Sequence, residues 1–329
     1  MNNFLDPAIL FFLFGLLAGA IKSNLEIPPA ISRFLSMYLL MALGLKGGFA
    51  LAQSGLSGDV VASLGAAMVL AVVVPLLSYT LLKRWVSAFD AAAVAATYGS
   101  VSAVTFITAI QYLEHQGVSY AGYMAAAMAL MESPAIIVAV VMASRIRQAQ
   151  AAGGAALAAG PANASPSPLR KVLHESLTDG AQLLLLGAMA VGLLSGASGQ
   201  AAMQPFVGDL FKGMLAFFLL DMGLMTARNA GQVRGLSLYL VAYALISPLV
   251  HAGLALALAW GLGLPVGNAA LLMVLAASAS YIAVPAVLRY AVPEASPSLY
   301  LGLSLGLTFP FNILLGIPLY TAVAQRFLG

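Results

Sequence analysis

Two pairs of serines inside apolar segments are the residues of this sequence best suited to binding chemistry. Ser100 and Ser102 lie in "TYGSVSAVTF", and Ser278 and Ser280 lie in "AASASYIAVP". Hydroxyl groups donate hydrogen bonds, and a helix that is interrupted in the membrane presents unpaired N–H groups at its new N-terminus. Several short donors of this kind suit a small oxyanion. We therefore predict an anion site made by Gly99, Ser100, Ser102, Thr105, Ser278, Ala279 and Ser280.

A carboxylate in the apolar run "LMESPAI" indicates a second site, for a cation. Glu132 is costly to place in a membrane and is by default functional. Pro134 lacks an N–H group, so the carbonyl of Leu130 one turn earlier is free to bind a cation. Oxygen ligands of this type suit sodium, and no other metal is expected. The predicted set is Glu132, Ser133, Thr308 and Asn312. Proton coupling is the alternative, because a buried carboxylate binds a proton more readily.

The composition requires a membrane around these residues. The chain has 329 residues, of which 62% are hydrophobic and only 8% charged, whereas soluble domains are about one quarter charged. The net charge of +3 comes from residues in short loops and does not indicate nucleic acid. Cysteine is absent, which excludes disulfides and thiolate metal sites.

Apolar runs of about 20 residues, the length that crosses a bilayer, divide the chain into ten predicted helices. They cover 7–22, 29–52, 60–83, 88–113, 119–146, 175–197, 205–227, 236–261, 266–290 and 297–326. The stretch 148–169 is rich in Ala, Gly, Pro and Ser and is typical of a flexible cytoplasmic linker. We therefore expect one five-helix unit at 1–147 and a second at 170–329.

The placement of Lys and Arg supports this count. With the N-terminus outside, eleven basic residues fall in inner loops and only Lys46, Lys212 and Arg326 fall outside. Both termini are then expected on the extracytoplasmic side.

The two units resemble each other in the order of their motifs. Residues 97–113 align with 275–291 through the serine pairs, Pro75 aligns with Pro248, and Pro134 aligns with Pro310. Five is an odd number of helices, so the second unit enters the membrane from the opposite side. This is the inverted repeat of secondary transporters. Because Pro285 interrupts its helix, we expect the two serine-bearing helices to unwind locally and to meet.

Lys46 and Asp221 lie on helices that the repeat relates to each other. Two interpretations are open: the residues form a charge pair across the bundle, or Lys46 extends to the outer interface.

The function classes can now be separated. An intramembrane enzyme needs a nucleophile and a base within reach, and the sequence does not place such a pair at one depth. A channel needs a continuous polar path, whereas the polar residues gather in one central zone. A secondary transporter that is not an enzyme and has no cofactor beyond its coupling ion fits best.

The motifs "YGSVSAVTF", "LMESPAIIVAVV", "LISPLVHAG" and "AASASYIAVPAVLR" resemble the sodium-dependent bicarbonate transporter family over essentially all ten helices. The resemblance implies an all-α inverted-repeat fold with core and gate parts, and sodium-coupled bicarbonate import by an elevator-like motion. It further implies a homotrimer in the bacterial plasma (inner) membrane. In some members a small PII-like protein binds at the cytoplasmic side, which here would lie near the linker.

The chain also departs from the family's motifs. In the first motif Gly99 and Ser102 match, while Ala103 and Val104 replace Gly and Ser. In the second motif Tyr281 replaces an Asp that is a plausible cation ligand. These changes leave a sodium- or proton-coupled transporter of another small anion as the alternative function.

Overall fold

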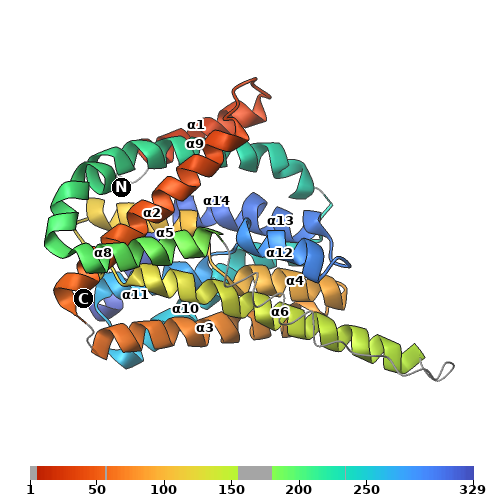
Figure 1. The fold of residues 1–329 in the computed structure, drawn as a ribbon. Helices are drawn as coiled ribbons and strands as arrows, with labels where there is room; N and C mark the ends of the chain where they lie inside the picture. The colour runs from red at the N-terminus through yellow and green to blue at the C-terminus, as the bar shows by residue number, and fades with distance from the viewer. Residues whose placement is uncertain (1–5, 56–57, 155–179, 234) are drawn as a thin grey trace.

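The computed structural model describes residues 6–55, 58–154, 180–233 and 235–329, which form helices and no strands (Figure 1). The helices are α1 (Pro7–Ala20), α2 (Pro29–Ser54), α3 (Gly58–Leu82), α4 (Ala88–Gly99), α5 (Ala103–His115), α6 (Met124–Gly154), α8 (Gly180–Gln204), α9 (Leu210–Asn229), α10 (Leu238–Leu262), α11 (Val266–Ala277), α12 (Ala283–Ala291), α13 (Pro297–Leu303), α14 (Phe309–Phe311) and α15 (Ile317–Leu328). Short π-helical turns at Pro205–Asp209, Ser304–Thr308 and Asn312–Gly316, and a 3-10 turn at Ala230–Val233, join some of them. The all-helical class predicted from the sequence is confirmed.

Seven helical stretches of the described chain are long and apolar enough to cross a membrane. They are Pro29–Gln53, Gly58–Leu82, Ala88–His115, Met124–Gln150, Leu183–Val233, Leu238–Leu262 and Pro297–Leu328. The stretch Leu183–Val233 contains both α8 and α9, while α1 and α11 have only 14 and 12 residues. At 1.5 Å per residue such helices reach about 20 Å, less than the roughly 30 Å of a bilayer core. Ten spanning segments therefore stay a prediction.

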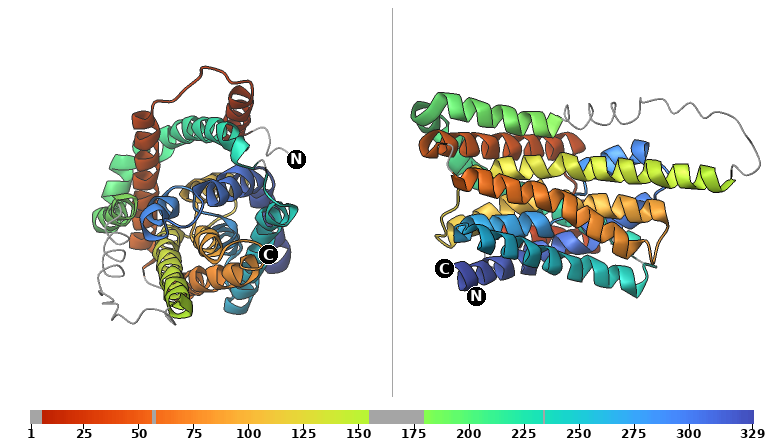
Figure 2. Two further views of the ribbon diagram at one scale, coloured as in Figure 1. Left: turned by 90° about the vertical axis from the view of Figure 1, so that its right-hand side faces the viewer. Right: turned by 90° about the horizontal axis from the view of Figure 1, so that it is seen from below.

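The helices form two parts. In one part, α1 packs against α9 and α2 against α8, and α2 also contacts α9. We call these four helices the outer layer. The remaining helices form a bundle in which α3 packs on α4 and α6, and α10 on α11. The left view of Figure 2 shows the red and green outer layer along one side of the yellow, orange and blue bundle.

Glycines let the helices of the outer layer approach each other closely. A Cβ atom on Gly223 of α9 would lie 2.8 Å from the backbone nitrogen of Leu16 in α1. A Cβ on Gly192 of α8 would lie 2.6 Å from the carbonyl oxygen of Leu45 in α2. Small residues at such contacts are a main source of helix association in lipid. Each pair joins a helix from before residue 155 to one from after residue 179.

Helix α6 is longer than predicted. It has 31 residues and ends at Gly154, so residues 148–154 continue the helix although the sequence assigned them to the linker. Their composition, "QAQAAGG", explains the difference because alanine and glutamine are good helix formers. Residues 155–169 of the predicted linker lie outside the described residues.

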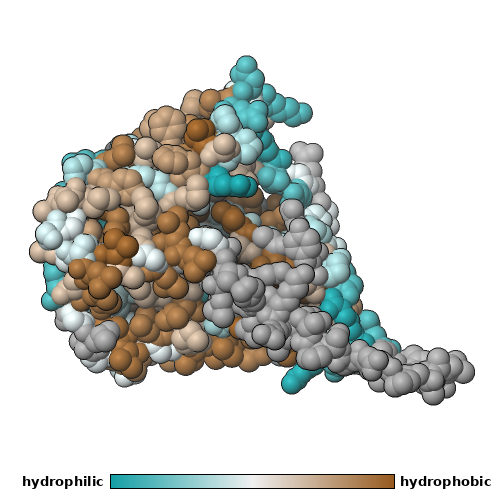
Figure 3. Space-filling model, viewed as in Figure 1, coloured by the Kyte–Doolittle hydropathy of each residue, from teal (hydrophilic) through white to brown (hydrophobic). Residues whose placement is uncertain are grey.

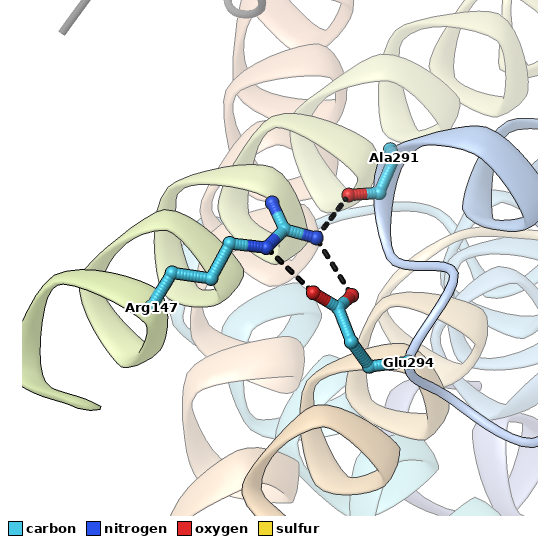
Figure 4. A network of polar contacts seen from close by, with 3 residues as sticks. All are labelled: Arg147, Ala291 and Glu294. Atoms are coloured by element: carbon cyan, nitrogen blue, oxygen red, sulfur yellow. Dashed lines mark hydrogen bonds and ion pairs between the residues drawn. The ribbon is translucent and has the colours of Figure 1, made fainter. Parts of the chain in front are cut away.

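A charged contact ties the end of α6 to the loop after α12 (Figure 4). The guanidinium group of Arg147 donates to both oxygens of Glu294, each at 2.7 Å, and to the carbonyl oxygen of Ala291 at 3.0 Å. This bidentate pairing lowers the pKa of the Glu294 carboxyl group from its usual value. In the same loop, the N–H of Ser296 donates to the carboxylate of Asp90 in α4 at 2.8 Å. The loop is thus fastened to two helices of the bundle.

The visible outer surface is largely apolar. Figure 3 shows hydrophobic residues over most of the face, with hydrophilic residues gathered toward the end where α6 extends. Large apolar side chains such as Leu194 and Val61 are exposed. Such a surface is stable against lipid and not against water.

Candidate functional site

Both helices that carry the serine pairs are interrupted, as the sequence predicted. The first is helical to Gly99 and again from Ala103, and the second to Ala277 and again from Ala283. The two interruptions contact each other. The N–H of Ser102 donates to the hydroxyl of Ser278 at 3.0 Å, and the N–H of Ser280 donates to the carbonyl of Thr97 at 2.8 Å. The backbone groups that the interruptions free are therefore partly satisfied across the crossing.

The local sequence explains where the helices restart. The hydroxyl of Ser102 accepts from the N–H of Thr105 at 3.2 Å, so Ser102 is the N-cap of α5. Pro285 falls in the first turn of α12, where an N–H group has no helical partner to lose. Gly99 is needed for space and not for flexibility, because a Cβ there would lie 2.6 Å from the ring of Pro75.

A small cavity of about 70 Å³ lies at the crossing, between the bundle and the outer layer. Ser102, Ser280 and Tyr281 line it from the two interruptions, and Glu132 lines it from α6. Helices α2, α8 and α9 close the other side through residues that include Leu39, Leu185 and Phe218. The N-termini of α5 and α12 meet this cavity, since Ala103, Val104 and Ala283 also line it. The cavity therefore combines backbone donors, hydroxyl groups and one carboxylate.

The serine hydroxyl groups at the crossing differ in whether their proton is already used in a hydrogen bond within the protein. Ser278 donates to the carbonyl of Leu275 at 2.9 Å while it accepts from Ser102, so its single proton is in use. Ser102 and Ser280 instead accept from backbone N–H groups, the latter from Val284 at 3.3 Å. Their protons can point to a ligand. Ser278 therefore has a structural role: its hydroxyl joins the two interrupted helices, and we call it a structural pin in this sense.

The other predicted anion ligands are buried but lie outside the lining of the cavity. The side-chain oxygens of Ser100 and Thr105 have no hydrogen-bond partner among the described residues. Ala279 packs in an apolar cluster of the bundle. Gly99 ends α4 beside Pro75. Ser102 and Ser280 are thus the two predicted anion ligands that line the cavity.

The predicted cation ligands do not come together. Glu132 lines the cavity, and the side chain of Ser133 lies outside the described part of the structure. Thr308 bonds to the hydroxyl of Tyr98 at 2.6 Å and donates to the carbonyl of Ala244 at 2.7 Å. Asn312 donates to the carbonyl of Ala277 at 2.8 Å and accepts from Tyr320 at 2.9 Å. Thr308 and Asn312 therefore hold helices of the bundle together, away from the cavity lining.

Lys46 and Asp221 do not form the charge pair that was one interpretation of the sequence. Lys46 pairs with Glu114 at 3.2 Å and lies 4.5 Å from the ring centre of Phe211. Asp221 lies ten residues after Phe211 in α9, which is about 15 Å along the helix axis. Its carboxylate accepts a hydrogen bond from the hydroxyl of Ser32. The separation along the helix explains why the two charges do not meet.

Lys46 and Glu114 line a second, larger cavity of about 600 Å³, which we call the vestibule. Its polar lining also includes Lys212 and Asp209. On α5, Ile110 lines the vestibule and Ile107, one turn away, lines the small cavity. On α6, Met124 lines the vestibule and Met128, again one turn away, lines the small cavity. The vestibule therefore ends about one helical turn from the small cavity.

Tyr281 also lines the small cavity. The sequence marked this position only as one where a tyrosine replaces the Asp of the family motif. The side chain of Tyr281 is buried, its hydroxyl donates a weak hydrogen bond to the sulfur of Met222 at 3.6 Å, and it lies near the Ser102 side chain. A phenol donates one hydrogen bond, as a serine hydroxyl does. Its position three residues after Ser278, inside the interruption, was the available signal.

Interrupted helices that meet inside an apolar helical fold are common in secondary transporters. A family model described as the Na+-dependent bicarbonate transporter superfamily matches residues 7–325. The chain belongs to this superfamily. It is therefore a membrane transporter, and membership of a transporter family implies a protein that is not an enzyme. A search of curated proteins gives no match.

Proposed function

We propose that this protein is a secondary transporter that imports bicarbonate together with sodium. The observation that carries the proposal is the small cavity, where the N-termini of α5 and α12, the hydroxyls of Ser102 and Ser280, and Glu132 all lie together. Its volume of about 70 Å³ suits a small ion and no larger substrate.

The anion is bound by donors that the fold holds in place. Two helix N-termini direct N–H groups and partial positive charge at one point. Ser102 and Ser280 add hydroxyl donors, and the Tyr281 phenol adds a third when its proton turns from the weak acceptor Met222 to the anion. These donors match the acceptor oxygens of bicarbonate. Such an oxyanion needs several short hydrogen bonds and no counter-charge from a lysine or arginine.

Glu132 couples the anion to a cation. An anion about 5 Å from the Glu132 carboxylate, which lines the same small cavity, is repelled by about 3 kcal/mol at an effective dielectric constant near 20. A sodium ion bound beside the carboxylate removes this repulsion. By linkage, each ion then strengthens binding of the other by on the order of 100-fold. Thr308 and Asn312 act in this scheme as supports of the bundle.

The remaining features of the proposal follow the family. Ten helices form two inverted five-helix repeats, the outer layer is the gate, and the bundle is the core that moves in an elevator-like step. The vestibule faces the extracytoplasmic side with both termini, since Lys and Arg concentrate at the other side. The protein is a homotrimer in the bacterial inner membrane, with a PII-like regulator docking near the linker.

The test is uptake of radiolabelled bicarbonate into proteoliposomes, with an inward sodium gradient and again with potassium in its place. We expect accumulation with sodium only. Ser280→Ala should raise the KM for bicarbonate, whereas Glu132→Gln should weaken the dependence on sodium. Thr321→Ala is the matched control, because its hydroxyl bonds to the Ile317 carbonyl within α15.

Uptake that is equal with sodium and potassium would remove sodium coupling from the proposal. Folded, inserted protein without bicarbonate uptake would favour the alternative, a sodium- or proton-coupled transporter of another small anion. Tyr281, Ala103 and Val104, which differ from the family motifs, are the residues that would account for a changed cargo. A thermal-shift screen of small anions, with and without sodium, would then identify it.

A further inference from the structure

Helix α10 carries a row of polar side chains that the proposed transport cycle does not use. Tyr243, Ser247 and His251 are spaced four residues apart, so they lie on one face of the helix. Ser78 of α3 belongs to the same cluster, because it and Ser247 both lie close enough to the Tyr243 hydroxyl to interact with it, although none of these pairs has the geometry of a hydrogen bond. All four side chains are at least nine-tenths buried.

Each of these four side chains has a polar atom without a partner in the described protein. They are the hydroxyl oxygens of Ser78, Tyr243 and Ser247 and the Nδ1 atom of His251. Unpaired polar atoms are rare in folded proteins and are especially costly next to lipid, where water does not replace the missing bond. Four of them in one place indicate a site for a polar group that the protein itself does not supply.

The four side chains line a groove of about 240 Å³ between α3 and α10, which we call the α3–α10 groove. Its walls are apolar, and Leu77, Ile246 and Val250 are each roughly half exposed on the surface that faces lipid. Trp85 and Tyr239 stack at one end with ring centres 5.6 Å apart. Such aromatic residues are typical of the membrane interface. The groove therefore opens to the bilayer and runs inward from its interface.

The lining defines the chemistry of an occupant. It contains no charged side chain among the described residues, so a charged headgroup would be uncompensated. The His251 ring bonds to the backbone of Ala276, which leaves Nδ1 as an acceptor in the neutral ring. The serine and tyrosine hydroxyls can both donate and accept. A group that donates and accepts at once, on an apolar body, satisfies this set.

We propose that the α3–α10 groove binds a neutral, hydroxyl-bearing amphiphile from the membrane, with its hydroxyl among Ser78, Tyr243 and Ser247 and its chain along the apolar walls. The occupant is connected to the transport site through His251. The His251 ring bonds to the backbone of Ala276, which lies two residues before Ser278. Binding therefore supports the interrupted helix α11. This inference is independent of which ion is carried.

The experiment is photolabelling of the full-length protein in nanodiscs with a long-chain alcohol that carries a diazirine and an alkyne. A matched probe has a methyl group in place of the hydroxyl. We expect the alcohol to label residues 77–85 and 239–251, and excess unlabelled alcohol to compete. The methyl probe should label these segments about tenfold less, the effect of losing one or two hydrogen bonds.

Paired variants test the contribution of the polar atoms. The double variant Ser78→Ala with Ser247→Ala should lose about tenfold of the alcohol labelling. Its thermal stability should be unchanged or higher, because two unpaired hydroxyls are removed. Thr80→Ala is the control, since Thr80 lies on α3 outside the groove and bonds to the Leu77 carbonyl. Equal labelling by both probes, or full labelling of the double variant, would overturn the proposal.

Discussion

Ser278 provides a sharp test, because the sequence predicts a ligand at this position and the structure places a pin. Its hydroxyl donates to the Leu275 carbonyl at 2.9 Å and accepts from the Ser102 N–H at 3.0 Å. Ser278→Ala removes the acceptor and leaves a buried N–H group unpaired, which costs about 1–3 kcal/mol. The Leu275 carbonyl keeps a weaker contact to the Ser278 N–H at 3.3 Å, so little is added there.

The expected result is a loss of stability with a small effect on substrate affinity. For a chain of this size, 1–3 kcal/mol corresponds to roughly 1–4 °C in apparent melting temperature. Thermal unfolding in detergent, followed by fluorescence, measures the shift. Ser100→Ala is the stability control, since Ser100 is equally buried and its hydroxyl has no partner in the described residues. It should melt at or above the temperature of the parent.

A comparison of KM values completes the test. Ser280→Ala should raise the KM for bicarbonate, and it should also lower the melting temperature because it removes the acceptor of the Val284 N–H at 3.3 Å. Ser278→Ala should lower the melting temperature without a matching rise in KM. If Ser278→Ala instead raised KM as much as Ser280→Ala and left the melting temperature unchanged, the assignment of Ser278 as a pin would be wrong.

Three further outcomes are expected. The pKa of Glu294 is lowered by Arg147, so their pairing stabilises the protein above about pH 4.5 and is lost as the pH falls below it. Glu294→Gln should therefore abolish a pH-dependent stability term of about 0.5–1 kcal/mol, small because the pair is partly exposed, in melting curves from pH 6 to pH 3. Gly99→Ala places a Cβ atom against Pro75 and should destabilise by about 1–3 kcal/mol, and Pro75→Ala should partly restore the melting temperature. Tyr281→Phe removes one donor from the small cavity and should raise the KM for bicarbonate about 3- to 10-fold, whereas an unchanged KM would exclude the phenol from binding.

The interruptions could be predicted because their signals are local. A Ser-x-Ser pair in an apolar run, followed in one case by a proline, changes hydrogen bonding within a few residues. The structure confirms both interruptions and their contact. The direction in which each hydroxyl donates depends on the partner helix, so the difference between Ser278 and Ser280 could not be predicted.

Pairings between distant helices were harder to predict for a geometric reason. The sequence contains several acidic residues that could pair with Lys46. Lys46 pairs with Glu114 and not with Asp221 because of where each residue lies along its helix axis in the packed structure. Similarly, Thr308 and Asn312 were assigned by their repeat position beside Pro310. The π-helical turns at Ser304–Thr308 and Asn312–Gly316 displace side chains from regular helical spacing there, which a repeat alignment does not reveal.

The glycine contacts of the outer layer have a consequence for synthesis in the cell. Helices α1 and α2 find their close partners in α9 and α8, which are translated after residue 179. About 200 residues separate the end of α1 from the end of α9, so at 5–20 residues per second the first helices wait on the order of 10 to 40 seconds in the bilayer. During that time the glycines of α1 and α2 that later contact α9 and α8, such as Gly15 and Gly48, meet lipid or insertion machinery. Assembly of the outer layer is therefore a late, post-insertion event, and a chain truncated after α6 leaves both glycine faces without their partners.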